Sequence, residues 1–236
     1  MTDQQAPQES TGTDKRQDNV LWLQLWKDQR TDFHQQQVSP LLPRFWNNQT
    51  VAKNARVLVP LCGKSQDMLW LAARGHRVIG VELSPLAVKA FFSENNLKVK
   101  KSRVGNFTCW QSGLITIWCG DFFSLQKHQL GKVDIVFDRA ALTALSGAIR
   151  QQYIGQLCQL IGINCQIFLL TVEDIDNHSQ QSPDMIDSEI TALYAGQFDI
   201  SLMHTESACV PETHPQTAGF HTESKVYRLT YKPVPA

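Results

Sequence analysis

The sequence lacks a glycine-rich G-x-G-x-x-G run, a C-x-x-C pair and an excess of charge of either sign. Lys and Arg together number 22, as do Asp and Glu, so the formal net charge is zero. This balance argues against a nucleic-acid partner, because a nucleic-acid surface needs a basic excess. No apolar stretch approaches the ~18 to 20 residues of a membrane-spanning helix, so we also expect no membrane partner.

Cysteine and histidine are present but not in the spacings of structural sites. The six cysteines are scattered, several of them within apolar runs, which predicts reduced, buried thiols in a cytoplasmic protein. The seven histidines have no metal-ligand spacing, so we predict no metal site. The polar N-terminus has no apolar core of a secretory signal, and we expect residues 1–18 to form a mobile tail before a single domain of residues 19–236.

Strand-like and helix-like patterns alternate from about residue 55 onward. Strands are predicted at 55–61, 76–82, 114–123, 132–142, 165–174, 198–208 and 224–232. Helices are predicted at 65–75, 84–95, 149–162 and 184–196, and residues 97–113 form either a hairpin or a loop. This alternation is typical of an α/β fold with a doubly wound, mainly parallel sheet, which the last two strands close as an antiparallel edge.

Ligands of such sheets bind at the carboxyl ends of the strands, which draws attention to the turn at 60–64 and to Glu82. The turn holds one glycine, Gly63, and therefore suits a ligand with one ribose and no phosphates better than NAD. Glu82 ends the second strand about 20 residues later, where an acidic side chain accepts hydrogen bonds from ribose hydroxyls. The alternative for Glu82 is a solvated side chain at a strand end.

Two further strand ends carry polar residues. Asp121 is placed to meet an adenine amino group and Phe122 to cover the ring; the alternatives are a helix N-cap and a core aromatic. Asp138 and Arg139 follow the next strand, at the lip where a substrate would sit. An ion pair, mutual or capping a helix, explains them equally well.

The segment before the first predicted strand is rich in aromatic side chains. Trp22 and Trp26 lie four residues apart, so one helical face presents both indoles, and Phe33 and His34 follow. Core packing is the commoner role of aromatics at this spacing. The alternative is a lid that excludes water from the site.

Several motifs occur together in one order: W-x-x-x-W, F-H-Q, V-L-V-P-L-C-G-K-S-x-D-M-x-W-L-A-x-x-G-H-x-V-x-G-V-E-L-S, G-D-F-F and D-R-A-A-L. With them the chain resembles the thiopurine S-methyltransferase family, particularly its bacterial members, from about Trp22 to Leu145. The resemblance implies the seven-stranded class I methyltransferase sheet, with residues 19–54 as an N-terminal helical cover. It also implies S-adenosylmethionine as the cofactor, and a monomer.

The resemblance also implies roles for single residues. Cofactor contacts carry over to Trp26, Leu61, Glu82 and Arg139. Asp121 and Phe122 match positions at the adenine, and Phe33 matches a position near the methyl acceptor. The chain departs from the family at Asp32 and over 173–187, where only Pro183 matches a stretch of the acceptor wall.

These observations predict methyl transfer to the sulfur of a small aromatic or heterocyclic thiol, and bacterial relatives are associated with selenium and tellurium methylation. No catalytic base stands out, and thiols ionise easily enough to react without a strong one. Two alternatives are a non-catalytic module that binds the cofactor on the same fold, and a nicotinamide-dependent oxidoreductase. The oxidoreductase needs a pyrophosphate seat, which a lone glycine does not provide.

Overall fold

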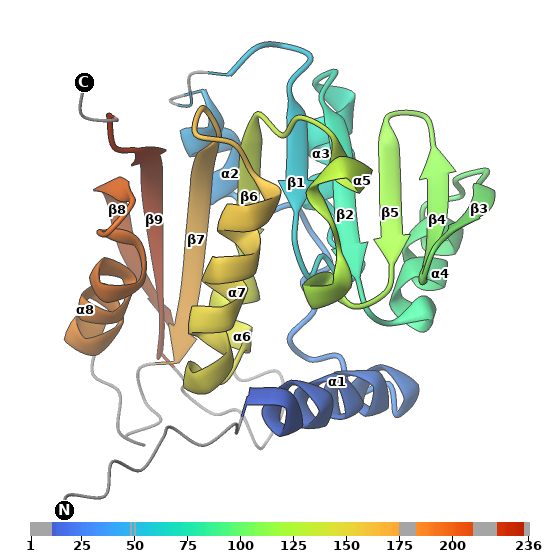
Figure 1. The fold of residues 1–236 in the computed structure, drawn as a ribbon, viewed down its shortest axis with the longest axis horizontal. Coiled ribbons are helices and arrows are strands. Elements are labelled where there is room, and N and C mark those ends of the chain that lie inside the picture. Colours follow the sequence, from blue (N-terminus) through green and yellow to red (C-terminus); the bar gives the residue numbers. More distant parts are fainter. Residues whose placement is uncertain (1–10, 48, 50, 175–182, 210–220, 234–236) are drawn as a thin grey trace, which may run out of the picture.

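A nine-stranded sheet runs through the protein in the order β3-β4-β5-β2-β1-β6-β7-β9-β8 (Figure 1). The structure is a computed structural model and describes residues 11–47, 49, 51–174, 183–209 and 221–233. The strands are β1 (Arg56–Val59), β2 (Arg77–Glu82), β3 (Lys100–Val104), β4 (Phe107–Ser112), β5 (Ile115–Cys119), β6 (Ile135–Arg139), β7 (Gln166–Asp174), β8 (Phe198–Cys209) and β9 (His221–Tyr231).

The centre of the sheet is parallel and both of its edges are antiparallel. Strands β5, β2, β1, β6 and β7 run parallel, whereas β9 and β8 pair antiparallel at one edge. The predicted mainly parallel sheet with an antiparallel edge is confirmed. At the other edge β3 and β4 form an antiparallel hairpin, so the whole sheet has two strands more than the seven expected. This hairpin occupies the predicted hairpin-or-loop segment.

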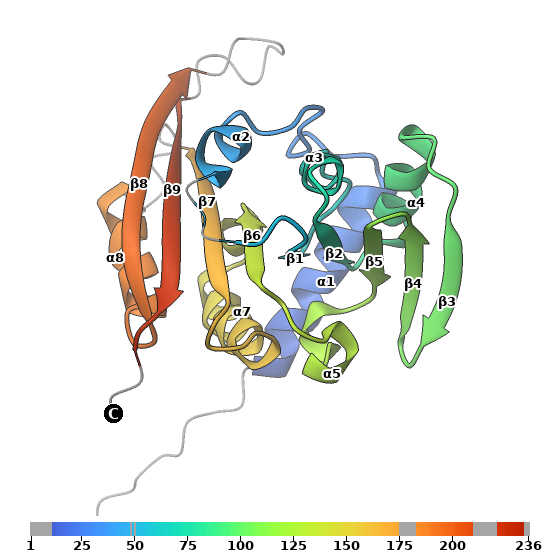
Figure 2. The same ribbon diagram turned by 90° about the horizontal axis from the view of Figure 1, so that it is seen from above.

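Helices cover both faces of the sheet (Figure 2). One face carries α2 (Leu41–Trp46), α3 (Asp67–Ala73) and α4 (Pro85–Glu94). The other carries α5 (Lys127–Leu130), α6 (Ala141–Ala144), α7 (Gly147–Leu160) and α8 (Pro183–Tyr194), with the short 3-10 helix η1 (Phe122–Ser124). Each face buries its own cluster of apolar side chains, because strands with both faces covered must be apolar on both.

Helix α1 (Thr11–Lys27) lies across the end of the sheet where the parallel strands terminate (Figure 1). It packs against α4 and α7, which belong to opposite faces. Helix α1 begins at Thr11, within the tail predicted for residues 1–18. Residues 1–10 of that predicted tail lie outside the described residues.

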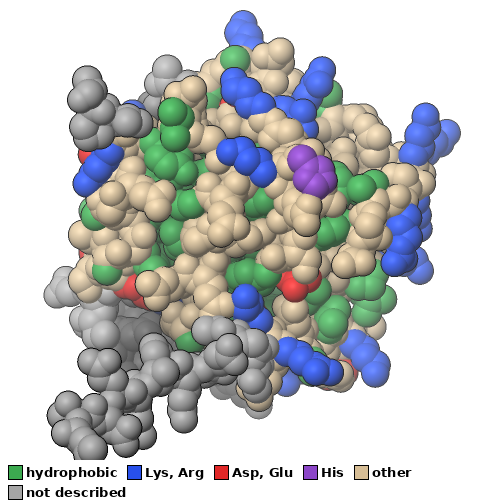
Figure 3. Space-filling model, in the orientation of Figure 1, with side chains coloured by type: hydrophobic (Ala, Val, Ile, Leu, Met, Phe, Trp, Pro, Cys, Tyr) green, Lys and Arg blue, Asp and Glu red, His purple; other side chains and the backbone are tan. Residues whose placement is uncertain are grey.

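Strand β3 forms one edge of the sheet, and all five of its residues are exposed. It carries Lys100, Lys101 and Arg103, and the Lys101 ammonium lies 3.5 Å from the centroid of the Trp110 ring on β4. Figure 3 shows Lys and Arg side chains along the side of the molecule where β3 lies. Within the described ranges, no helix has both the length and the apolar character needed to cross a bilayer.

Candidate functional site

The turn between β1 and α3 is fixed by backbone geometry and by its bonds to β2. Leu61 and Gly63 both have positive φ, 45° and 52°, a region that glycine enters easily and leucine does not. The backbone N–H of Cys62 donates to the carbonyl of Val81 at 2.9 Å. The turn therefore lies directly beside the end of β2, as the sequence predicts for a ligand-binding bend.

Glu82 joins that turn to the start of α4. Its Oε2 accepts a hydrogen bond from the Gly63 N–H at 2.8 Å, and its Oε1 accepts one from the Ser84 N–H at 2.7 Å. Its side chain is buried rather than solvated. Burial raises the pKa of Glu82, while the N–H groups of Ser84, Gly63 and Leu83 lower it. Since a carboxylate can accept about four hydrogen bonds, Glu82 retains capacity for further donors.

Aromatic residues of the N-terminal segment cover the turn. A Cβ placed on Gly63 would lie 3.4 Å from Cζ2 of Trp26, so the indole is in van der Waals contact with this glycine. Phe33 packs edge-on against Trp22 and Trp26, at centroid distances of 5.3 and 5.6 Å. Trp26 is only 8% exposed whereas Phe33 is 47% exposed, so the cover has a packed inner side and an open outer one.

Arg139 reaches from the end of β6 to the β1–α3 turn. Its Nε lies 2.7 Å from Oδ2 of Asp67, and it also donates to the Ser65 hydroxyl at 3.0 Å. Asp67 is fully buried, and its Oδ1 accepts from the backbone N–H of Ser39 at 2.8 Å. The Asp67 carboxylate thus connects the cover segment, the turn and β6. The alternative of a mutual ion pair between Asp138 and Arg139 is not observed, because Arg139 pairs with Asp67 instead.

Asp138 is fully buried beneath this edge of the sheet. Its Oδ1 accepts from the N–H groups of Ala141 and Leu142 at the start of α6, and its Oδ2 accepts from the Tyr153 hydroxyl at 2.7 Å. The helix-capping alternative describes this geometry. Burial raises the pKa of Asp138 to about 6, against the lowering effect of these hydrogen bonds.

Asp121 and Phe122 lie after β5, at the same edge. Asp121 caps η1, because its Oδ1 accepts from the Phe123 N–H at 2.9 Å. Phe122 is 2% exposed and packs between Phe123 and Tyr153, with centroid distances of 5.8 and 5.2 Å. Both alternatives, the N-cap and the core aromatic, are observed. A contact of either residue with adenine stays a prediction.

The structure adds residues that the sequence did not single out, chiefly Asp67 and Tyr153. Asp67 belongs to the quoted C-G-K-S-x-D-M motif, so its position was visible although its partner was not. The acceptor-wall stretch 173–187 lies largely outside the described residues. Among the residues that are described, no group of His, Cys, Asp and Glu is arranged to hold a metal ion.

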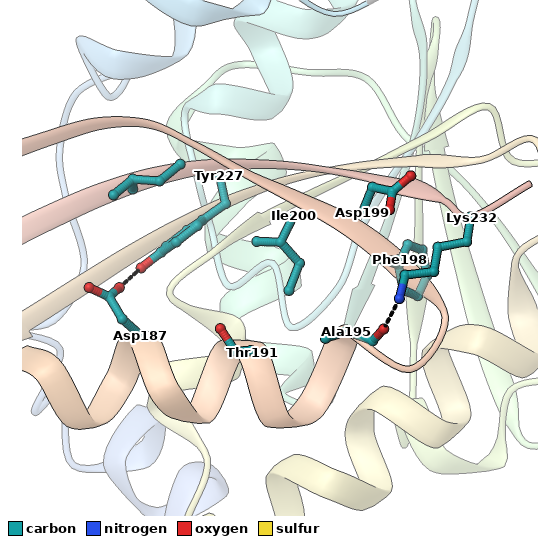
Figure 4. Close-up of a pocket in the computed structure, with 9 residues that line it drawn as sticks. Asp187, Thr191, Ala195, Phe198, Asp199, Ile200, Tyr227 and Lys232 are labelled. Atoms are coloured by element: carbon teal, nitrogen blue, oxygen red, sulfur yellow. Dashed lines mark hydrogen bonds between the residues drawn. The ribbon is translucent and has the colours of Figure 1, made fainter.

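A hollow of about 510 Å³ lies elsewhere, between α8 and the strands β8 and β9 (Figure 4). In it the Tyr227 hydroxyl donates to Asp187, and Lys232 donates to the carbonyl of Ala195 at 2.6 Å. It contains none of the predicted site residues. We therefore locate the candidate site at the carboxyl ends of the parallel strands, where the predicted residues converge.

The residues at that edge fit an adenosyl cofactor that carries one ribose. Glu82 offers a buried carboxylate with acceptor capacity, and Gly63 beside it has no Cβ to obstruct a close approach. The guanidinium of Arg139 lies on the same turn. These donors and acceptors suit ribose hydroxyls and an amino-acid carboxylate.

Comparisons with known proteins point the same way. The family model described as Thiopurine S-methyltransferase (TPMT) matches residues 17–232. A thiopurine S-methyltransferase of Stutzerimonas stutzeri is 52% identical over 217 residues, covering 91% of this chain and 92% of its own. One of Bordetella petrii is 40% identical over 215 residues, covering 90% and 98%.

Solved structures show the same fold at low sequence identity. The 1,6-didemethyltoxoflavin-N1-methyltransferase of Burkholderia thailandensis aligns with a TM-score of 0.61 and 16% identity, covering 96% of this chain and 93% of its own. A TehB-like SAM-dependent methyltransferase of Corynebacterium glutamicum aligns with a TM-score of 0.52 and 12% identity, covering 92% and 100%.

Proposed function

Because the chain belongs to the thiopurine S-methyltransferase family, we propose that it transfers the methyl group of S-adenosylmethionine to the sulfur of a small aromatic or heterocyclic thiol. The cofactor supplies a methyl group activated on a sulfonium, and the protein supplies position and environment. The observation that carries the proposal is the lone-glycine turn held against Glu82 by the 2.8 Å hydrogen bond from Gly63.

We assign the adenosyl and amino-acid parts of the cofactor to separate residues. Glu82 accepts hydrogen bonds from the ribose hydroxyls, and the backbone of Leu61 and Gly63 allows the ligand to approach. Arg139 has N–H groups beyond those used by Asp67 and Ser65, and it binds the carboxylate of the amino-acid tail. The indole of Trp26 closes the site above Gly63 and excludes water.

Asp121 and Phe122 form the adenine side of the proposed site. One oxygen of Asp121 caps η1, which orients the carboxylate and leaves the other oxygen for the adenine amino group. Phe122 is too deeply buried to cover a whole ring, so we assign it to the floor of the adenine pocket.

We assign the acceptor to the open side of the cover. Phe33 is exposed enough to stack on an aromatic acceptor. Asp138 is buried, so its effect on the substrate is indirect: it fixes the start of α6 and with it the position of Arg139. Holding acceptor and methyl donor in line contributes roughly 7 to 11 kcal/mol to lowering such a barrier.

Methyl transfer from labelled S-adenosylmethionine tests the proposal. The protein is incubated with a panel of aromatic thiols and with selenium and tellurium oxyanions, and labelled product is counted. Transfer to thiols is expected. Calorimetric binding of S-adenosylhomocysteine without transfer to any acceptor identifies the non-catalytic module instead. A fluorescence change on mixing with NADH supports the oxidoreductase alternative.

We also infer a cytoplasmic monomer. The cysteines within the described residues, Cys62, Cys109, Cys119, Cys158 and Cys165, are free thiols, which suits a reducing compartment. Light scattering on a sizing column tests the oligomeric state, and a mass of one chain is expected.

A further inference from the structure

His34 is a titratable side chain at the proposed site that has no role so far. It follows Phe33, and its backbone N–H donates to the Thr31 carbonyl at 2.8 Å. Its Nε2 is shielded from solvent and has no hydrogen-bond partner among the described residues. A shielded ring nitrogen without a partner is costly to leave in a folded protein, which points to a ligand that completes it.

The charges around His34 come from three elements of the site. Lys64 lies on the β1–α3 turn, Glu94 at the end of α4 and Arg139 at the end of β6. Burial lowers the pKa of His34, as do Lys64 and Arg139, whereas Glu94 raises it. The imidazole is therefore neutral at pH 7, with one ring nitrogen available as a proton acceptor.

We propose that His34 is the general base that takes the proton of the acceptor thiol through Nε2. The acceptor S–H bond breaks toward the imidazole, which becomes an imidazolium. The electron pair of the broken S–H bond stays on the acceptor sulfur and forms its bond to the transferred methyl carbon. The bond between that carbon and the sulfonium sulfur of S-adenosylmethionine breaks at the same time, and its electron pair stays on that sulfur, so S-adenosylhomocysteine leaves as a neutral thioether. The imidazolium then releases its proton to water. This inference rests on the proposed methyl transfer and adds the residue that activates the acceptor.

Other titratable groups nearby already have partners or are out of reach. Lys64 pairs with Glu94 at 2.8 Å, and Asp138 accepts from Tyr153 and from the start of α6. Cys62 is buried, and burial raises the pKa of its thiol well above the ordinary value. Of these groups, only His34 combines a free nitrogen with a position beside the exposed Phe33.

The test compares acceptors that need a base with acceptors that do not. One group is aromatic thiols with electron-withdrawing ring substituents, which are ionised at the assay pH. The other is aryl-methane thiols, which remain protonated. For His34→Gln we expect a loss in kcat/KM of about 100-fold or more with the protonated thiols. With the ionised thiols we expect little change.

Two measurements separate a base from a packing residue. By calorimetry, S-adenosylhomocysteine should bind His34→Gln with the same affinity as the wild type. His204→Gln, on β8 and away from this site, is the control variant and should keep wild-type rates with both groups of thiols. NMR titration should give His34 a pKa below that of an unperturbed histidine, about 6.5, and one that shifts when thioanisole is added as a product-like probe.

Equal loss with both groups of thiols, or no loss with either, overturns the proposal. So does an imidazole that does not respond to the probe. A wild-type protein that methylates no thiol contradicts the proposed function instead, and the NMR titration still reports on His34 in that case.

Discussion

The carboxylate of Glu82 accepts a hydrogen bond from the backbone N–H of Gly63 at 2.8 Å, which connects the end of β2 to the β1–α3 turn. A second oxygen of the same carboxylate accepts from Ser84, the N-cap residue of α4. One buried acid therefore orders both loops of the proposed cofactor site.

Glu82→Gln should weaken S-adenosylhomocysteine binding by about 10-fold or more, because hydrogen bonds to a charged acceptor contribute roughly 1.5 to 3 kcal/mol each. Calorimetric titration measures this affinity, with the melting temperature recorded beside it. Glu206→Gln, on β8 with a side chain that is 40% exposed, is the matched control and should bind normally. Unchanged affinity of the Glu82 variant would refute the ribose contact.

Gly63→Ala should destabilise the turn and weaken cofactor binding. The new Cβ meets Trp26 at 3.4 Å, and a positive φ of 52° costs an alanine roughly 1 to 2 kcal/mol. Urea unfolding measures the loss of stability.

Gly155→Ala is the matched control for that substitution. Gly155 is exposed within α7, and an added Cβ meets no described atom within 4 Å. This change should stabilise the protein by roughly 0.5 to 1 kcal/mol, because alanine is the better helix former. Equal effects of the two substitutions would contradict a special role of the turn.

Arg139→Ala should cost about 3 to 5 kcal/mol of stability, because it leaves the fully buried carboxylate of Asp67 without its charged partner. Adding Asp67→Asn should recover part of this loss, and a double-mutant cycle by urea unfolding measures the coupling. Arg44→Ala is the control, since its ion pair with Glu206 is exposed and contributes about 0 to 1 kcal/mol. Strictly additive losses at 67 and 139 would exclude the coupling.

Asp138 should make stability depend on pH. Its pKa is about 6 in the folded protein against an ordinary value of 3.8, so the folded state holds the proton more tightly than the unfolded chain. The contribution of the Asp138 carboxyl to the free energy of unfolding is fully present below pH 3.8 and is lost as pH rises through about 6.

Between pH 4 and 7 the unfolding free energy of the wild type should therefore fall, relative to Asp138→Asn, by on the order of 3 kcal/mol. Urea unfolding of both proteins over this pH range measures the difference. A constant difference for Asp138→Asn would show that the carboxyl titrates alike in both states.

The order of strands and helices was predictable because each central strand is a short apolar run and several helices have a clear start or stop signal. Ser84 before Pro85 marks the start of α4, where the Ser84 hydroxyl accepts from the Ala87 N–H. The start of α1 at Thr11 was not predictable, because residues 11–18 are polar and carry no apolar period. Packing against α4 and α7 orders this helix, and such contacts are not written in local sequence.

The approach of Glu82 to the turn at Gly63 was predictable, because it follows from an acidic residue at a strand end and a glycine in the turn after the neighbouring strand. Pairings between residues that are far apart in the chain were not predictable. Arg139 and Ser65 are 74 residues apart, and Asp67 looks like an ordinary acid in the first turn of a helix. The lack of a hydrogen-bond partner for Nε2 of His34 in the described part of the chain depends on the residues packed around it, so it could not be predicted from the sequence.

The cationic edge at β3 also bears on how the protein behaves at high concentration. An outermost strand exposes unsatisfied N–H and C=O groups that invite pairing with another chain, and closely spaced lysines deter it by repulsion. Lys100, Lys101 and Arg103 would face their own counterparts if two copies met along this strand. The cationic side chains of β3 thus oppose edge-to-edge pairing of sheets from different molecules. Replacing them with neutral side chains should raise aggregation while leaving the protein interior unchanged.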